Sequence, residues 1–90
     1  MSDYPYRYDL MNPFAMILLA GVLFDGAKRY GETNWRNISA KEHINHALGH
    51  LFQALIWLDS DDKETTPILE DLSHAFCRVM FALGKVNDEL

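Results

Sequence analysis

Three stretches of the chain have the length and the hydrophobic pattern of helices. The first is predicted to begin at Pro13, with Asn12 as its N-cap, and to end at Tyr30, with Gly31 as a left-handed C-cap. Residues 14–24 of this helix are apolar on every side. Because no side is polar enough to face water, we expect the helix to be enclosed at the centre of the fold or between subunits.

The second predicted helix begins after Ser39, which forms a capping-box pattern with Glu42. It is expected to continue to Leu58 or Asp59. Apolar residues recur along it at spacings of three and four, which predicts one apolar stripe. The stripe consists of Ile44, Ala47, Leu48, Leu51, Leu55 and Leu58.

The third predicted helix begins at Thr66 and Pro67, a cap residue followed by proline in the first turn. Gly84 is expected to end it and residues 85–90 to form a frayed tail. Its apolar residues also share one face. They are Ile68, Leu72, Ala75, Phe76, Val79 and Leu83.

Residues 1–11 carry alternating tyrosines, Tyr4, Tyr6 and Tyr8, and are expected to form an extended arm over the helices or over a neighbouring subunit. No stretch has the length and alternation of a sheet. The pattern predicts one all-α domain over residues 1–90, a three-helix antiparallel unit with an N-terminal arm. We expect this unit to assemble as a homo-oligomer, a dimer or larger.

Composition supports the oligomer and limits the partners. Hydrophobic residues make up 49% of only 90 positions, whereas a domain of this size hides only about 60–65% of its unfolded surface. The net charge of −5 argues against a general nucleic-acid binder. The longest apolar run, residues 14–24, is too short to cross a membrane, and the first residues do not resemble a secretion signal. We therefore expect a soluble, cytoplasmic protein.

Residues 24–36 combine cations, aromatic rings and an amide, a mixture that suits a nucleotide. The cations would hold phosphates, an aromatic ring would stack on the base, and the amide would pair with the base edge. Alternatively, the cations offset the negative end of the first helix and the tryptophan fills the core. The candidate ligand-binding residues are Lys28, Arg29, Tyr30, Asn34, Trp35 and Arg36.

Three histidines, His43, His46 and His50, lie on one face of the second helix. They could contribute to a metal site with help from another element, or be exposed polar residues beside the apolar stripe. His50 is expected to lie deepest and is a candidate ligand-binding residue. The single cysteine, Cys77, excludes an internal disulfide bond and is expected to be a packed residue.

On the third helix, His74 can contact Glu70 and Asp71, and Arg78 lies one turn further on. A carboxylate beside an imidazole can orient it for acid–base chemistry or hold Mg²⁺ or Mn²⁺. The same group can equally be a solvated polar face, with the acids placed at the positive end of the helix. His74 is a candidate ligand-binding residue.

These residues resemble a known family. The motifs are Arg7-Tyr8-Asp9-Leu10 before Asn12-Pro13, Gly26-Ala27-Lys28-Arg29-Tyr30-Gly31 before Asn34-Trp35, His50-Leu51, and Leu72-Ser73-His74-Ala75. Over residues 7–83 the chain resembles the phage-associated dATP/dGTP diphosphohydrolase N-terminal family, which is similar to the all-α nucleotide pyrophosphohydrolases. That resemblance implies a helical oligomer that hydrolyses nucleoside triphosphates to monophosphate and pyrophosphate with Mg²⁺ or Mn²⁺.

The sequence departs from the pattern at the metal-binding end. The Glu-x-x-Glu and Glu-x-x-Asp motifs of the all-α pyrophosphohydrolases are absent, Gly49 replaces the arginine before His50, and Asp71-x-x-His74 replaces His-x-x-His. The loop at residues 59–64 also differs. If the protein is an enzyme, its candidate metal ligands are Asp25, Asp59, Glu70 and Asp71.

Three hypotheses follow. The first is a protein that binds a purine nucleotide near subunit interfaces without turnover, as a phage would use to sequester a nucleotide, including a cyclic signalling nucleotide of host defence. The second is a Mg²⁺- or Mn²⁺-dependent dATP/dGTP pyrophosphohydrolase. The third is a structural or protein-binding subunit, which leaves the cations and aromatic rings of residues 24–36 unexplained.

Overall fold

The computed structural model describes residues 3–61 and 64–89, and all regular elements within them are helical. Three α-helices, α1 (Pro13–Tyr30), α2 (Ala40–Leu58) and α3 (Thr65–Glu89), are joined by short connections. Two 3₁₀ turns, η1 (Tyr8–Leu10) and η2 (Asn34–Asn37), precede α1 and α2. The predicted all-α class is confirmed. The first two helices begin where they were expected, whereas α3 begins at Thr65, so that Thr66 lies inside the helix and is not its cap.

Local capping explains where α1 and α2 begin. The Asn12 side chain accepts a hydrogen bond from the Ala15 amide at 3.0 Å, and the Ser39 hydroxyl accepts one from the Glu42 amide at 3.1 Å. Gly31 ends α1 with φ 92° and ψ 151°. The positive φ was predicted, but the left-handed helical conformation was not correct. The observed ψ places Gly31 in a region that is open almost only to glycine.

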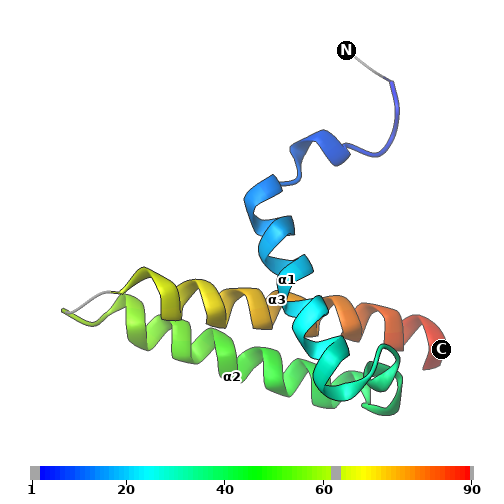
Figure 1. Ribbon diagram of the computed structural model, residues 1–90. Coiled ribbons are helices and arrows are strands. Elements are labelled where there is room, and N and C mark those ends of the chain that lie inside the picture. The colour runs from blue at the N-terminus through cyan, green and yellow to red at the C-terminus, as the bar shows by residue number, and fades with distance from the viewer. Residues whose placement is uncertain (1–2, 62–63, 90) are drawn as a thin grey trace.

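The three helices do not run along one another as a single bundle. Figure 1 shows α2 and α3 side by side, joined at one end, while α1 crosses α3 and carries the N-terminal arm away from this pair. The described part of the arm, residues 3–11, does not lie over the helices. Its tyrosines, Tyr4, Tyr6 and Tyr8, are exposed and contact one another, with ring centroids 5.6–6.3 Å apart.

Most of the residues buried on α2 and α3 have small side chains. On α2 the buried residues recur at intervals of three, four and seven, and they are Ala40, His43, Ala47 and Ala54. On α3 they are Ser73, Ala75, Cys77 and Ala82. Because most of these side chains end at or near Cβ, the two helices can approach closely, but the apolar area that they bury is small.

The large apolar side chains of the predicted stripes lie on the surface instead. On α2, Ala47 is buried, but the other five members of the stripe are exposed. On α3, Ala75 is buried, whereas the larger members from Leu72 to Leu83 are exposed. On α1 only Leu19 is buried, so this helix is not enclosed within one chain. The hydrophobic pattern thus located the helices correctly but did not identify the face that they bury.

The end of α3 differs from the prediction. Gly84 does not end the helix, which continues to Glu89, so residues 85–89 are not a frayed tail; Leu90 lies outside the described residues. A methyl group at position 84 would lie 3.1 and 3.2 Å from two carbons of the Trp35 ring. The glycine therefore permits close packing of η2 against α3. Lys85 strengthens this contact by donating to the carbonyl oxygen of Arg36 at 2.8 Å.

Candidate functional site

A cleft of about 530 Å³ opens between the second half of α1, the segment that follows it, and the second half of α3. Its volume lies within the range of small-molecule sites, about 300–1,000 Å³. Six of the twelve candidate residues line it, and they are Asp25, Arg29, Tyr30, Asn34, Trp35 and His74. Residues from opposite ends of the sequence thus meet at one hollow of the surface.

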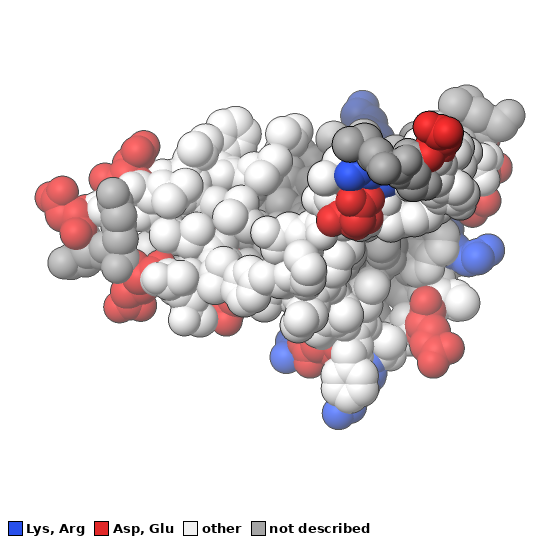
Figure 2. Space-filling model, turned by 90° about the horizontal axis from the view of Figure 1, so that it is seen from above, with Lys and Arg blue, Asp and Glu red and all other residues white. Residues whose placement is uncertain are grey.

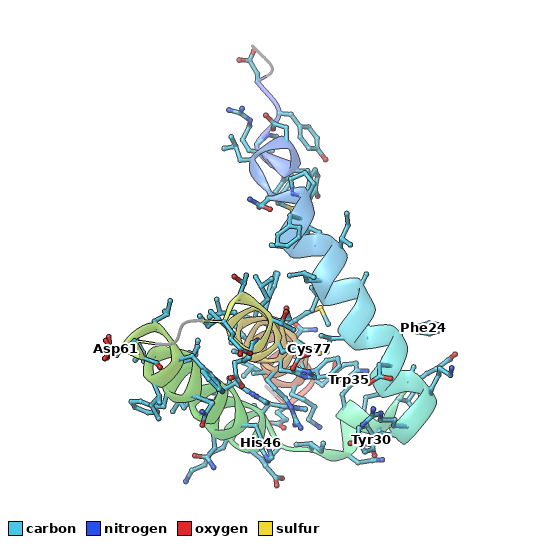
Figure 3. All side chains as sticks on the ribbon, turned by 60° about the vertical axis from the view of Figure 1, so that its left-hand side comes forward. Phe24, Tyr30, Trp35, His46, Asp61 and Cys77 are labelled. Atoms are coloured by element: carbon cyan, nitrogen blue, oxygen red, sulfur yellow. The ribbon has the colours of Figure 1, made fainter. Side chains whose placement is uncertain are left out.

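The three predicted phosphate-binding cations have different surroundings. Arg29 lines the cleft and pairs with Asp25 at 3.2 Å, one turn earlier on α1. Both side chains are more than half exposed, so this ion pair adds little stability and leaves Arg29 free to exchange its partner. Lys28 and Arg36 do not line the cleft. Lys28 lies 5.2 Å from the centre of the Phe24 ring, and Figure 3 shows Phe24 pointing away from the α2/α3 pair.

The two aromatic candidates also differ. Trp35 stacks on Phe81 with ring centroids 5.4 Å apart and an angle of 6° between the planes, and its ring lies against Gly84. The Arg36 guanidinium lies 5.0 Å from the same ring. These contacts agree with the alternative in which Trp35 fills the core, although Trp35 also lines the cleft. Tyr30 lines the cleft and is 67% exposed, so it has a ring available to a ligand.

A buried histidine and an arginine form the inner wall of the cleft. His43 is fully buried, which corrects the expectation that His50 lies deepest, since His50 is only half-buried. The Nε2–H of His43 donates to the Trp35 carbonyl oxygen at 2.9 Å, and Arg78 Nη1 donates to His43 Nδ1 at 3.2 Å. Since a carbonyl can only accept and a guanidinium can only donate, the imidazole is the neutral tautomer with its proton on Nε2.

His50 on α2 and His74 on α3 form a second cluster. His50 Nδ1 bonds to Asp71 Oδ1 at 2.9 Å, and the His50 and His74 rings stack with centroids 5.2 Å apart. His50 and Asp71 line a shallower hollow with His46. The pKa of His74 lies below its ordinary value, first because its ring is partly removed from water and second because of the charge of His50. His74 also lines the main cleft and so connects the two hollows.

The candidate metal ligands do not come together. Asp25 pairs with Arg29, Asp71 bonds to His50, and Glu70 and Asp59 are exposed, Asp59 at the end of α2. Within residues 3–61 and 64–89, no group of three or more histidine, cysteine or acidic side chains could hold a metal ion. The described part of one chain therefore does not fit Mg²⁺ or Mn²⁺.

Cys77 is buried beside the cleft, and burial raises the pKa of its thiol. The positive charge of Arg78 lowers it by a smaller amount. The thiol is therefore protonated at neutral pH, when it is a poor nucleophile. This agrees with the prediction of a packed residue.

Neither His43 nor Arg78 was predicted from the sequence to be a ligand-binding residue. Both side chains line the cleft, yet His43 was grouped with the other two histidines of α2 and Arg78 with the polar face of α3. Their contact joins residues 35 positions apart. For His43 a signal was present, because it lies in register with Ala40, Ala47 and Ala54 on the buried face of α2.

Residues 1–89 match the family described as dATP/dGTP diphosphohydrolase, N-terminal. The chain belongs to this family. The resemblance seen in the sequence is thereby confirmed, and the match covers the whole of the main cleft. No curated protein and no solved structure matches the chain. None of the helices in the described ranges is long and apolar enough to cross a membrane.

Proposed function

We propose that the cleft between α1, η2 and α3 binds a purine nucleotide and that the chain holds this nucleotide without turnover. The observation that carries the proposal is the meeting of cationic, aromatic and amide side chains in one hollow of about 530 Å³. Arg29 supplies positive charge for phosphates, the ring of Tyr30 stacks on the base, and the Asn34 amide pairs with the base edge. The family name supports purine nucleotides, dATP and dGTP, as the ligand class.

The arrangement of the acidic residues supports binding without turnover. Hydrolysis of a phosphoanhydride depends on groups that neutralise developing charge and orient the attacking water. The four candidate carboxylates are dispersed, and two of them already bond to basic side chains. Within the described residues of one chain, the cleft offers groups that bind a nucleotide but no assembled group that would position a water molecule for attack.

We also propose that the functional unit contains a second copy of this chain. Large apolar side chains lie on the surface of α1, α2 and α3, and the first half of α1 projects away from the α2/α3 pair. One chain thus presents both a projecting apolar helix end and an exposed apolar face, and a second copy can cover each of them with the other. Since the second half of α1 lines the cleft, its contacts with that copy would hold one wall of the nucleotide site in place.

Incubation of the purified protein with dATP, dGTP and cyclic di- and trinucleotides, with and without Mn²⁺, tests the proposed function. Chromatography of the solution and of the ligand released by heat should recover an intact purine nucleotide from the protein. New monophosphate and pyrophosphate would contradict binding without turnover and support the pyrophosphohydrolase. Absence of any bound or converted nucleotide would contradict both.

A pair of asparagine variants locates the site. Asn34→Ala should weaken binding of the recovered nucleotide by about 5- to 20-fold, since one hydrogen bond is lost. Asn87→Ala is the matched control, because Asn87 is exposed near the end of α3 and lines neither hollow. Equal affinities of the two variants in equilibrium dialysis would place the base elsewhere.

A further inference from the structure

The guanidinium of Arg78 has an unusual environment for a half-buried cation. Within residues 3–61 and 64–89 it forms no ion pair, and the hydrogen bond found for it runs from Nη1 to the neutral ring of His43. Arginine has five N–H donors in a rigid fork. Most of them therefore remain available at the wall of the cleft, where no carboxylate of the described residues forms an ion pair with the guanidinium.

His43 fixes the direction of this guanidinium. The imidazole is fully buried, its Nε2–H is held by the Trp35 carbonyl oxygen at 2.9 Å, and its ring lies 5.3 Å from that of Phe81. Nδ1 therefore carries no proton and accepts the hydrogen bond from Arg78. A neutral acceptor orients the arginine but leaves its full positive charge, whereas a carboxylate would have cancelled it.

We propose that Arg78 is the main anion-binding residue of the cleft and that it takes a phosphate group of the nucleotide, with His43 as a positioning residue. This inference rests on the proposed function and identifies which part of the ligand the inner wall recognises. A guanidinium donates two parallel hydrogen bonds to a phosphate, which suits this fork better than a single acceptor does. Arg29, at the exposed rim and paired with Asp25, would contact a phosphate second.

The proposal explains why the cleft holds a cation at its inner wall in a chain of net charge −5. An unpaired charge removed from water is unfavourable unless a partner arrives. A phosphate that binds there removes that penalty, so the unpaired arginine favours the liganded state. The partly buried side chain of Arg78 also loses less freedom on binding than the exposed Lys28 or Arg36 would.

The test compares three probes, dATP, deoxyadenosine and inorganic pyrophosphate, on wild type, Arg78→Met, Arg78→Lys and Lys41→Met. Lys41→Met is the matched control, because it removes one positive charge from an exposed position outside both hollows. Affinities are measured by titration calorimetry or NMR shifts, and circular dichroism checks that each variant remains helical. Arg78→Lys keeps a donor for His43 if loss of the whole side chain impairs folding.

We expect Arg78→Met to weaken dATP and pyrophosphate binding by about 10- to 100-fold and to leave deoxyadenosine binding unchanged. Arg78→Lys should fall between it and wild type, since an ammonium group lacks the fork. Lys41→Met should bind all three probes as wild type does. Loss of deoxyadenosine affinity equal to the loss of dATP affinity would overturn the proposal in favour of a packing role, as would unchanged dATP affinity.

The probes separate this inference from the proposed function. A wild-type protein that binds pyrophosphate through Arg78 but neither nucleotide nor nucleoside retains the anion site and contradicts the nucleotide function. A wild-type protein that binds dATP while Arg78→Met binds it equally well retains the function and contradicts the anion site. Failure of the wild type to bind any of the three probes contradicts both.

Discussion

His74 is a residue whose environment can be tested without any ligand. Its ring stacks on His50, lines the main cleft, and lies near Glu70, Asp71 and Arg78, which all act on its charge. Partial removal from water and the charge of His50 outweigh the two carboxylates, so the pKa of His74 lies below its ordinary value of 6.5. The unfolded chain thus binds this proton more readily, and the contribution of His74 to folding stability falls as the pH drops below about 6.5.

Replacement of His50 should raise the pKa of His74. His50→Gln removes the positive charge that opposes protonation and frees Asp71, whose charge favours it, so both changes act in the same direction. An NMR titration of the His74 ring measures the shift. His46→Gln is the control, since His46 lies on the same helix but does not act on His74. A His74 pKa that falls or stays the same in His50→Gln would show that the stacked pair does not interact as described.

At the scale of the element, helix ends that are set by neighbouring residues were predicted correctly, whereas the helix end that depends on a distant residue was not. Asn12 and Ser39 cap their helices through atoms three residues away, so the starts of α1 and α2 could be inferred directly. Gly84 was interpreted as a helix end because glycine often ends helices. Its actual reason is the Trp35 ring, 49 positions earlier, and no local pattern reports that contact.

The candidate site was likewise predicted only where its residues are close in sequence. The residues from Asp25 to Trp35 are close in sequence, and most of those proposed do line the cleft. The opposite wall, with His43 and Arg78, is formed by tertiary contacts of α2 and α3. The helical pattern could not supply it, because large apolar residues define the stripes while small ones define the buried face.

Two glycine substitutions test the role of Gly84. Alanine is favoured over glycine by about 1 kcal/mol inside a helix, so Gly49→Ala, with nothing within 4 Å of the new methyl group, should raise the free energy of unfolding by about that amount. Gly84→Ala gains the same helical preference but presses on the stacked Trp35 ring at 3.1 Å. Chemical denaturation should therefore show Gly84→Ala to be less stable than Gly49→Ala. Equal stabilisation by the two would mean that Trp35 moves freely.

At the scale of the whole molecule, the accessible surface is larger than that of a compact monomer of the same mass. The accessible area is 7117 Å², against about 5,400 Å² for a compact monomer of the same mass. The radius of gyration is 15.0 Å, against about 12 Å for a compact domain of 90 residues. Figure 2 shows a broad face free of charged side chains, with acidic residues gathered at the end where α2 and α3 are joined.

This excess predicts an oligomer, and its size fits one. The extra area is roughly 1,700 Å² per chain, comparable with the share that one partner buries in an obligate homodimer, about 1,000–2,500 Å². Light scattering at micromolar concentration should therefore give a mass at least twice the 10.4 kDa of the chain. Ile17 on α1 is 68% exposed, and a charge there would have to be buried without a partner in such an interface.

Ile17→Glu should consequently lower the measured mass to that of one chain, or shift the dissociation constant upward by at least 100-fold, corresponding to about 3 kcal/mol. Asn87→Glu adds the same charge at an exposed polar position and should leave the mass unchanged. If the cleft depends on the second copy, Ile17→Glu also weakens nucleotide binding, although position 17 does not line the cleft. A wild-type mass of 10.4 kDa would contradict the oligomer and require these apolar faces to be stable in water, where contiguous patches of this kind are rare.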